Sequence, residues 1–250
     1  MPMHYLCACG VLAVTTALTG CGGTPPLTIS AAASLRQVLP PLAPQARFGL
    51  AGSDTLAAQI REGAPVDVVV LADPRQMERL RAAGIVGEPA TIATNRLTII
   101  APRSNPAALQ TVTDLARPDL RLVLAHEGVP AGRYARAALT TLGMQGALAN
   151  VVSNEDSVTG VVAKVRLGEA DAGIVYVTDA RAAGASVVAI GIPTRAQPSI
   201  LYQAAVLTRS RRADEAAAFV ALLRSDRGRS ALVAAGFGPA PLPARTLRRR

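Results

Sequence analysis

Apolar segments typical of buried strands alternate with segments of helical periodicity along most of this chain of 250 residues. The segment 66–71, Val-Asp-Val-Val-Val-Leu, is apolar on both faces, as the strands of a parallel sheet are. A helical segment that carries Met77 and Leu80 follows it, with Pro74 at its start and Gly84 at its end. This alternation predicts an α/β fold with mainly parallel sheets and helices on both faces.

Composition and charge argue against several classes of partner. Aromatic residues make up 3% of the chain and tryptophan is absent, so a platform for stacking bases or sugars is not expected. The net charge is +9, but the arginines are scattered apart from a basic tail at 242–250, so we predict no nucleic-acid partner. The cysteines are Cys7, Cys9 and Cys21, which leaves the chain beyond them without a disulfide framework or a thiolate metal site.

The N-terminus predicts export across a bacterial membrane. Residues 1–20 contain no Asp, Glu, Lys or Arg and include the apolar run 6–18, which is too short to span a bilayer. The sequence Leu-Thr-Gly-Cys that ends at Cys21 resembles a bacterial lipobox. We therefore expect a signal peptide over 1–20, a lipid attached to Cys21 and a short tether over 21–26. The alternative is an ordinary secretory peptide, which would release a soluble periplasmic protein.

Ser34 marks a junction between a strand and a helical segment. A β-branched run and three alanines precede it, and Leu35, Val38 and Leu39 follow with the spacing of one helix face. This pattern predicts that Ser34 caps the N-terminus of a helix that begins with Leu35. A helix N-terminus presents free N–H groups and the positive end of the helix dipole, so it attracts anions without a charged side chain.

Similar junctions recur later in the chain. Ser53, Ala131 and Val158 each lie where a strand or loop meets the start of a helical segment. Tyr176 ends an apolar strand at the carboxyl edge of a sheet, where open α/β sheets bind their ligands. If these positions converge with Ser34, they form a pocket of hydroxyl and backbone donors that requires neither a cation nor an acceptor.

A family pattern is carried by six segments that follow one another in order. They are Ala-Ala-Ala-Ser-Leu at 31–35, Ser-Asp-Thr-Leu-Ala-Ala-Gln-Ile at 53–60, Gly-Ala-Pro-Val-Asp at 63–67, Val-Pro-Ala-Gly-Arg-Tyr-Ala at 129–135, Asp-Ala-Gly-Ile-Val-Tyr at 171–176 and Gly-Phe at 236–237. Over residues 27–240 the chain resembles the molybdate-binding periplasmic proteins of bacterial ABC importers.

The resemblance implies a two-lobed periplasmic-binding-protein-like fold of type II, with the ligand in the cleft between the lobes. The apolar strands near 97–101 and 201–206 flank the middle of the chain and are expected to cross between the lobes. Lobe 1 is then discontinuous and comprises 27–99 and 202–241, and lobe 2 comprises 100–201.

The resemblance also implies the roles of the site residues. The hydroxyls of Ser34, Ser53 and Tyr176 are expected to bind the oxygens of a molybdate ion. Backbone groups at or beside Ser34, Ser53, Ala131 and Val158 would complete the cage. In this arrangement no side chain ligates the metal atom directly, and no further cofactor is expected.

Three positions depart from the family pattern. Asp54 stands where the family commonly has a small hydroxyl residue, and its carboxylate would repel a dianion unless it points away. Ala125 and His126 replace an expected Asp-Pro before the Val-Pro-Ala-Gly loop, which predicts a differently shaped loop. Ser157 has the position of an inserted residue directly ahead of Val158.

A cage of donors suits a fully deprotonated tetrahedral oxyanion. Every oxygen of such an ion accepts hydrogen bonds, whereas monohydrogen phosphate carries a proton that a cage of donors cannot accept. Sulfate makes the same demand, so only the size of the cavity separates it from molybdate or tungstate. We find no Ser–His–Asp, Cys–His or paired-carboxylate arrangement in the sequence, so an enzyme is not expected.

The sequence therefore predicts a monomeric extracytoplasmic solute-binding protein that captures molybdate or tungstate by lobe closure. Its partners would be the permease of an ABC transporter and, through the lipid anchor, the membrane. The alternatives are a receptor for another small oxyanion or an organic solute, an enzyme on the same scaffold, and a basic surface protein whose tail binds anionic lipid or nucleic acid.

Overall fold

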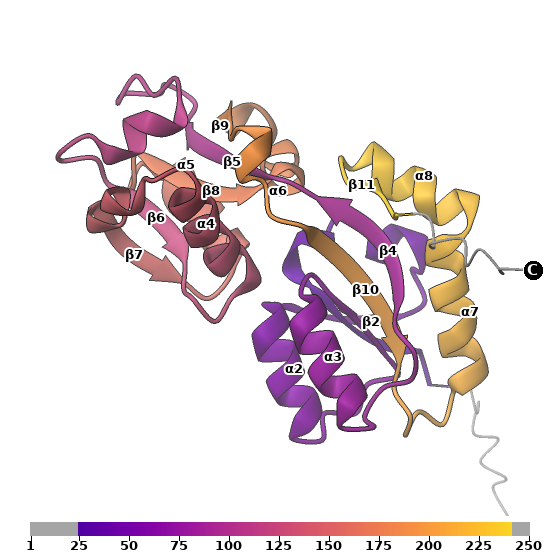
Figure 1. The fold of residues 1–250 in the computed structure, drawn as a ribbon. Coiled ribbons are helices and arrows are strands. Elements are labelled where there is room, and N and C mark those ends of the chain that lie inside the picture. Colours follow the sequence, from indigo (N-terminus) through magenta and orange to yellow (C-terminus); the bar gives the residue numbers. More distant parts are fainter. Residues whose placement is uncertain (1–24, 242–250) are drawn as a thin grey trace, which may run out of the picture.

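The protein folds into two lobes, seen in a computed structural model that describes residues 25–241 (Figure 1). The predicted signal peptide 1–20, the predicted lipid-bearing Cys21 and the basic tail 242–250 lie outside the described residues. Within residues 25–241, no helix combines the length and the apolar character that a membrane crossing requires.

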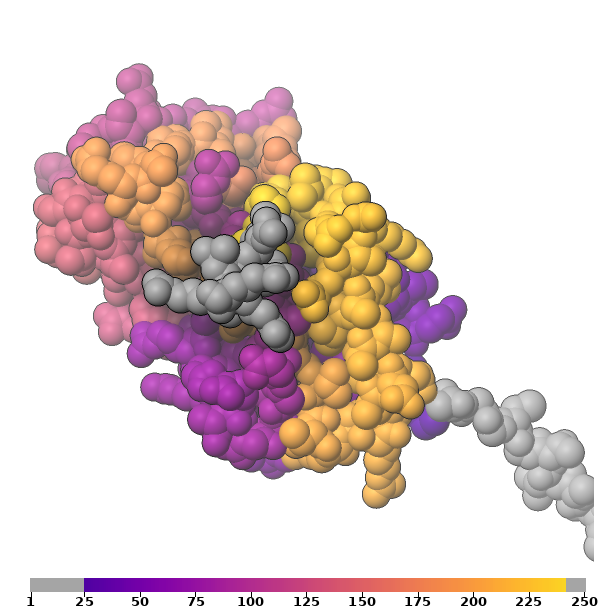
Figure 2. Space-filling model, turned by 45° about the vertical axis from the view of Figure 1, so that its right-hand side comes forward, coloured from indigo at the N-terminus to yellow at the C-terminus, as the bar shows by residue number. Residues whose placement is uncertain are grey.

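Lobe 1 is built on a six-stranded sheet with the strand order β11-β4-β10-β3-β1-β2. The strands are β1 (Thr28–Ala32), β2 (Arg47–Ala51), β3 (Val68–Leu71), β4 (Ala90–Asn95), β10 (Ile200–Val206) and β11 (Gly238–Pro239). The helices are the 3₁₀ turn η1 (Ala33–Leu35), α1 (Leu39–Leu42), α2 (Ser53–Arg61), α3 (Pro74–Ala82), α7 (Ala213–Arg224) and α8 (Asp226–Ala234). In the space-filling view, α7 and α8 form one side of this lobe (Figure 2).

Lobe 2 is built on a five-stranded sheet with the strand order β7-β6-β8-β5-β9. The strands are β5 (Leu97–Pro102), β6 (Leu122–Ala125), β7 (Val151–Glu155), β8 (Ala172–Tyr176) and β9 (Val187–Gly191). The helices are α4 (Pro130–Thr141), α5 (Val158–Arg166) and α6 (Val177–Ala183), with 3₁₀ turns η2 (Val112–Ala116), η3 (Gln145–Asn150), η4 (Gly184–Ser186) and η5 (Thr194–Ala196).

The two-lobed α/β fold is confirmed, but both sheets are mixed rather than mainly parallel. In lobe 1, β1 pairs in parallel with β2 and β3, whereas β10 is antiparallel to both β3 and β4. In lobe 2, β6 is parallel to β7 and β8, whereas β5 is antiparallel to β8 and β9. These antiparallel pairs involve β5 and β10, which follow the two connections between the lobes. Each of them runs in the direction opposite to the parallel strands of its sheet.

The core of lobe 1 lies on both faces of its sheet, and β3 shows this most clearly. Val68 and Val70 pack into the core that includes α7, whereas Val69 and Leu71 face α2 and α3. All four side chains are fully buried. Figure 1 shows α2 and α3 on one side of this sheet and α7 on the other. The segment 66–71 is therefore apolar on both faces because both faces of β3 are covered by helices, as the sequence predicts.

Two connections join the lobes, one from β4 to β5 and one from β9 to β10. In the connection from β4 to β5, the chain passes from the sheet of lobe 1 to the sheet of lobe 2 at Arg96. The predicted lobe boundary at 99 therefore falls inside β5. The predicted boundary at 201/202 likewise falls inside β10. Gln197 ties the two connections together, since its side chain accepts from Leu97 N–H at 2.8 Å and donates to Leu97 O at 2.9 Å.

The predicted helix with Ser34 as its N-cap is wrong. Ser34 lies inside η1, and the chain then passes through a turn into the four-residue α1. Pro40 and Pro41 explain the difference, because neither has the N–H group with which a helix begun at Leu35 would continue. The apolar stripe itself is present, since Leu35, Val38 and Leu39 are all buried in the core.

Gly132 fixes the start of α4 against the end of β6. A Cβ atom at this position would lie 2.1 Å from the carbonyl oxygen of Ala125 and 2.3 Å from that of His126. We predict that Gly132→Ala lowers the free energy of unfolding by about 1–3 kcal/mol, because backbone must shift to admit the methyl group.

Urea denaturation of the variant measures this loss, and Gly146→Ala is the matched control. A Cβ atom at Gly146 meets nothing within 4 Å, so this control should unfold at the wild-type urea concentration or slightly above it. Equal stability of the two variants would contradict the close packing of α4 on β6.

Candidate functional site

Residues of both lobes enclose one small cavity in the cleft. Its lining consists of Ala32, Ala33, Ser34, Ala51, Gly52, Ser53, Ala72, Val129, Pro130, Ala131, Ser157, Val158 and Tyr176. The space that the centre of a water molecule can occupy between these walls is about 20 Å³. Pockets for organic ligands typically measure roughly 300–1,000 Å³, so this cavity is suited to a smaller ligand.

The structure brings all five predicted site residues to this cavity. Ser34 comes from η1 and Ser53 is the first residue of α2, both in lobe 1. Ala131 is the second residue of α4, Val158 is the first residue of α5, and Tyr176 ends β8, all in lobe 2. The cavity therefore exists only while the two lobes face each other closely.

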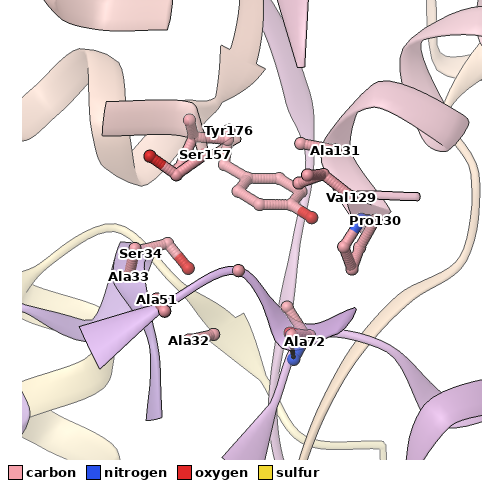
Figure 3. Close-up of a pocket in the computed structure, with 13 residues that line it drawn as sticks. Ala32, Ala33, Ser34, Ala51, Ala72, Val129, Pro130, Ala131, Ser157 and Tyr176 are labelled. Atoms are coloured by element: carbon pink, nitrogen blue, oxygen red, sulfur yellow. Dashed lines mark hydrogen bonds between the residues drawn. The ribbon is translucent and has the colours of Figure 1, made fainter. Parts of the chain in front are cut away.

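Tyr176 places a free hydroxyl group in the cavity. The residue is 2% exposed, and its hydroxyl oxygen is buried without a hydrogen-bond partner among the described residues. Burial raises the pKa of this phenol well above its usual value, so the group stays protonated and able to donate. Figure 3 shows the hydroxyl directed into the space between the lobes. An unpaired buried hydroxyl costs free energy that a ligand acceptor would recover.

The Ser34 side chain belongs to a series of hydrogen bonds that ends at Asn95, directly before the connection from β4 to β5. Its Oγ lies 2.7 Å from the hydroxyl of Tyr202, which in turn accepts from Asn95 Nδ2 at 3.3 Å. Either hydroxyl can donate in the bond between Ser34 and Tyr202, and when Tyr202 is the donor the Ser34 proton remains free for the cavity. The sequence analysis does not identify Tyr202 or Asn95 as supporting residues. Each is one of several polar residues in its strand, and no local pattern distinguishes it.

Ser53 has a structural bond in addition to its place in the cavity wall. Its Oγ accepts from Ala72 N–H at 3.0 Å and so ties α2 to the loop after β3. The residue is 2% exposed. Because the oxygen acts as acceptor in this bond, its hydroxyl proton stays available to a ligand.

Three helices begin at the cavity wall. The first N–H groups of α2, α4 and α5 have no partner within their own helices, and the positive ends of three helix dipoles meet there. Ser157 is the N-cap of α5, since its Oγ accepts from Gly160 N–H at 3.3 Å. Its hydroxyl is turned away from the cavity in Figure 3. The apparent insertion at Ser157 therefore supplies a cap and leaves Val158 as the first helical residue.

No charged side chain lines the cavity in the described part of the chain. An ion pair crosses the cleft, in which Arg133 Nη2 donates to Asp73 Oδ2 at 2.6 Å. Asp73 is 1% exposed and also caps α3 by accepting from Arg75 N–H. Arg133 is thus balanced by a carboxylate of the opposite lobe rather than aimed at the cavity.

Two of the departures from the family pattern lie face to face. Asp54 Oδ2 of lobe 1 is 3.9 Å from His126 Nε2 of lobe 2, and Asp156 Oδ1 is 3.6 Å from the same nitrogen. Gly128 N–H donates to His126 Nδ1 at 3.0 Å, which assigns the proton of the neutral ring to Nε2. Asp54 therefore points toward the imidazole at the cavity rim.

Comparisons with known proteins fit this architecture. The family model described as bacterial extracellular solute-binding protein matches residues 27–238. The molybdate-binding protein ModA of Mycobacterium bovis is 35% identical over 243 residues, which cover 93% of this chain and 92% of the relative. The chain belongs to this family of bacterial solute-binding proteins. The resemblance carried by the six sequence segments is confirmed.

Further relatives extend the match within the family. The molybdate-binding protein ModA of Escherichia coli is 32% identical over 197 residues, covering 72% of this chain and 77% of the relative. The solved structure of the periplasmic molybdate-binding protein of Azotobacter vinelandii has a TM-score of 0.76 at 23% identity, with 87% of this chain and 99% of that chain covered. Both of these proteins are named as molybdate-binding proteins.

The different bonding of Ser53 and Tyr176 predicts opposite effects of removing their hydroxyls from the ligand-free protein. Ser53→Ala should lower the free energy of unfolding by about 1–3 kcal/mol, because Ala72 N–H loses its acceptor. Tyr176→Phe should leave it unchanged or raise it, because the hydroxyl has no partner to lose. Urea denaturation of both variants measures the contrast. A loss in Tyr176→Phe as large as that in Ser53→Ala would show that the free protein satisfies this hydroxyl.

Proposed function

We propose that the protein captures molybdate, and equally tungstate, between its lobes and delivers it to the permease of an ABC importer. The observation that carries this proposal is the buried, unpaired hydroxyl of Tyr176 in a cavity where three helices begin and no charged side chain lies among the described lining residues. Family membership adds independent support.

The donor set accounts for the choice of ion class. The hydroxyls of Ser34, Ser53 and Tyr176 all have a proton to give, and the free N–H groups of the helix starts add further donors. A tetrahedral dianion without protons accepts from all of them. A protonated phosphate would bring one more donor into a cavity that offers it no acceptor. Sulfate differs from molybdate in size alone, so the fit of the cavity must separate the two.

Lobe closure is the proposed capture step, and it is supported by the contacts across the cleft. The ion pair between Arg133 and Asp73 joins the two lobes, and opening would leave the Asp73 carboxylate without its charged partner. Closure places both halves of the donor cage around the ion at the same time. Binding energy thus stabilises the closed form, which a permease can distinguish from the open one.

The place of the protein in the cell forms part of the proposal. An extracytoplasmic location is in accord with the family of extracellular solute-binding proteins. Attachment through lipidated Cys21 rests on the lipobox-like sequence, with a soluble monomer in the periplasm as the alternative. A receptor for an organic solute is the second candidate for function, and the small cavity argues against it.

Thermal shifts with four oxyanions test the proposed ligand. Molybdate and tungstate should each raise the melting temperature strongly, because a thousandfold excess over Kd stabilises the folded state by about 4 kcal/mol. Sulfate and phosphate should give much smaller shifts. No shift with any of the four ions would contradict an oxyanion ligand, and equal shifts with sulfate would contradict selection by size.

Tyr176→Phe identifies the site within this experiment. It should weaken molybdate binding roughly tenfold to a hundredfold, which corresponds to the loss of one charge-assisted bond of about 1.5–3 kcal/mol. Tyr134→Phe is the matched control, because Tyr134 does not line the cavity, and it should bind as the wild type does. Titration calorimetry measures both affinities, and equal losses would place the ligand elsewhere.

A further inference from the structure

A groove between the lobes adjoins the cavity on the side of Ser34. It consists of two hollows, one of about 150 Å³ between η1 of lobe 1 and α5 and α6 of lobe 2, and one of about 320 Å³ between the residues after η1, α6 and the end of α8. Ser34, Gln37 and Ala182 line both hollows, and Ser34 also lines the cavity. The groove therefore leads along the cleft to one of the donor hydroxyls.

Three arginines from the two lobes line this groove. Arg36 follows η1, whereas Arg166 ends α5 and Arg181 lies in α6. All three are exposed, and none of them takes part in an ion pair between described residues. Asp179 is the acidic residue in the lining, and burial raises the pKa of its carboxyl to about 7. With three arginines against one carboxyl, the groove has a net positive charge.

Another part of the cleft rim has the opposite sign. Asp54, Asp156 and Glu127 are grouped there around His126, and of these carboxylates only Glu127 faces an arginine, with Arg136 Nε at 3.3 Å. Asp156 is almost fully exposed, with 98% of its side chain accessible. A dianion that approaches the cleft is therefore repelled at this rim and attracted at the groove.

We propose that the groove of Arg36, Arg166 and Arg181 steers the oxyanion into the cleft. This inference rests on the proposed function, because it takes a small dianion as the ligand. The arginines act at long range and do not hold the bound ion, since the cavity itself is lined by neutral donors. Exposed charges of this kind raise the rate of encounter, and their effect decreases as salt screens them.

Stopped-flow binding of molybdate to the full chain tests the inference, with tyrosine fluorescence as the signal, since Tyr176 lines the cavity and tryptophan is absent. The double variant Arg36→Gln/Arg166→Gln should associate about tenfold more slowly than the wild type at 10 mM salt. At 0.5 M salt the two rates should agree, because the screening length is then only a few ångströms. The dissociation rate should not change.

A charge-matched control separates local steering from net charge. Arg47→Gln/Arg61→Gln removes two exposed arginines at the far ends of β2 and α2, and should associate at nearly the wild-type rate. Equal slowing in both double variants would overturn the inference in favour of a net-charge effect.

Neutralising the acidic rim tests the alternative route. A wild-type rate in Arg36→Gln/Arg166→Gln, together with faster association of Asp156→Asn, would overturn the inference in favour of approach past His126. A faster dissociation in the arginine variant would show that these residues hold the ion. Failure of the wild type to bind molybdate at all would instead overturn the proposed function, and the steering role with it.

Discussion

The site depends on hydrogen-bond donors that remain unpaired when the two lobes meet. Helices α2, α4 and α5 begin at the cavity, and the Tyr176 hydroxyl is buried there without a hydrogen-bond partner among the described residues. Each such group costs on the order of 1–3 kcal/mol when buried unsatisfied. Under the proposed function, an ion with acceptors on every side would satisfy these donors.

Charge is kept out of the cavity and arranged around it. Arg133, two residues after Ala131, is balanced by Asp73 of the other lobe at 2.6 Å. Asp54, directly after Ser53, faces His126. Both contacts join opposite lobes, while the described residues that line the cavity are neutral. Under the proposed function, this division would allow selection by protonation state and size, which a cluster of arginines would not provide.

Local sequence signals predicted the site better than the connections that support it. Ser53, Ala131, Val158 and Tyr176 follow from helix-start and strand-end patterns, which depend on a few neighbouring residues. The helix predicted from Ser34 does not form, because Pro40 and Pro41 lack the N–H groups that would continue it.

Contacts between distant parts of the chain could not be predicted in the same way. Tyr202 and Ser34 are 168 residues apart, so their bond is visible only after both lobes have formed. The lobe boundaries shifted for a related reason, since β5 and β10 are continuous apolar strands that do not show to which sheet they belong. Asp54 and His126 were each recognised as departures, but their meeting across the cleft follows from the fold alone.

A crystal structure of the molybdate complex would show whether neutral donors hold the ion. The anomalous signal of molybdenum should lie in the cavity between Ser34, Ser53 and Tyr176, with the ion's oxygens bonded by hydroxyl and backbone donors and Arg133 still paired with Asp73. An ion held by Arg133 after release of Asp73, or an ion bound among the arginines of the groove with the cavity empty, would contradict a cage of neutral donors.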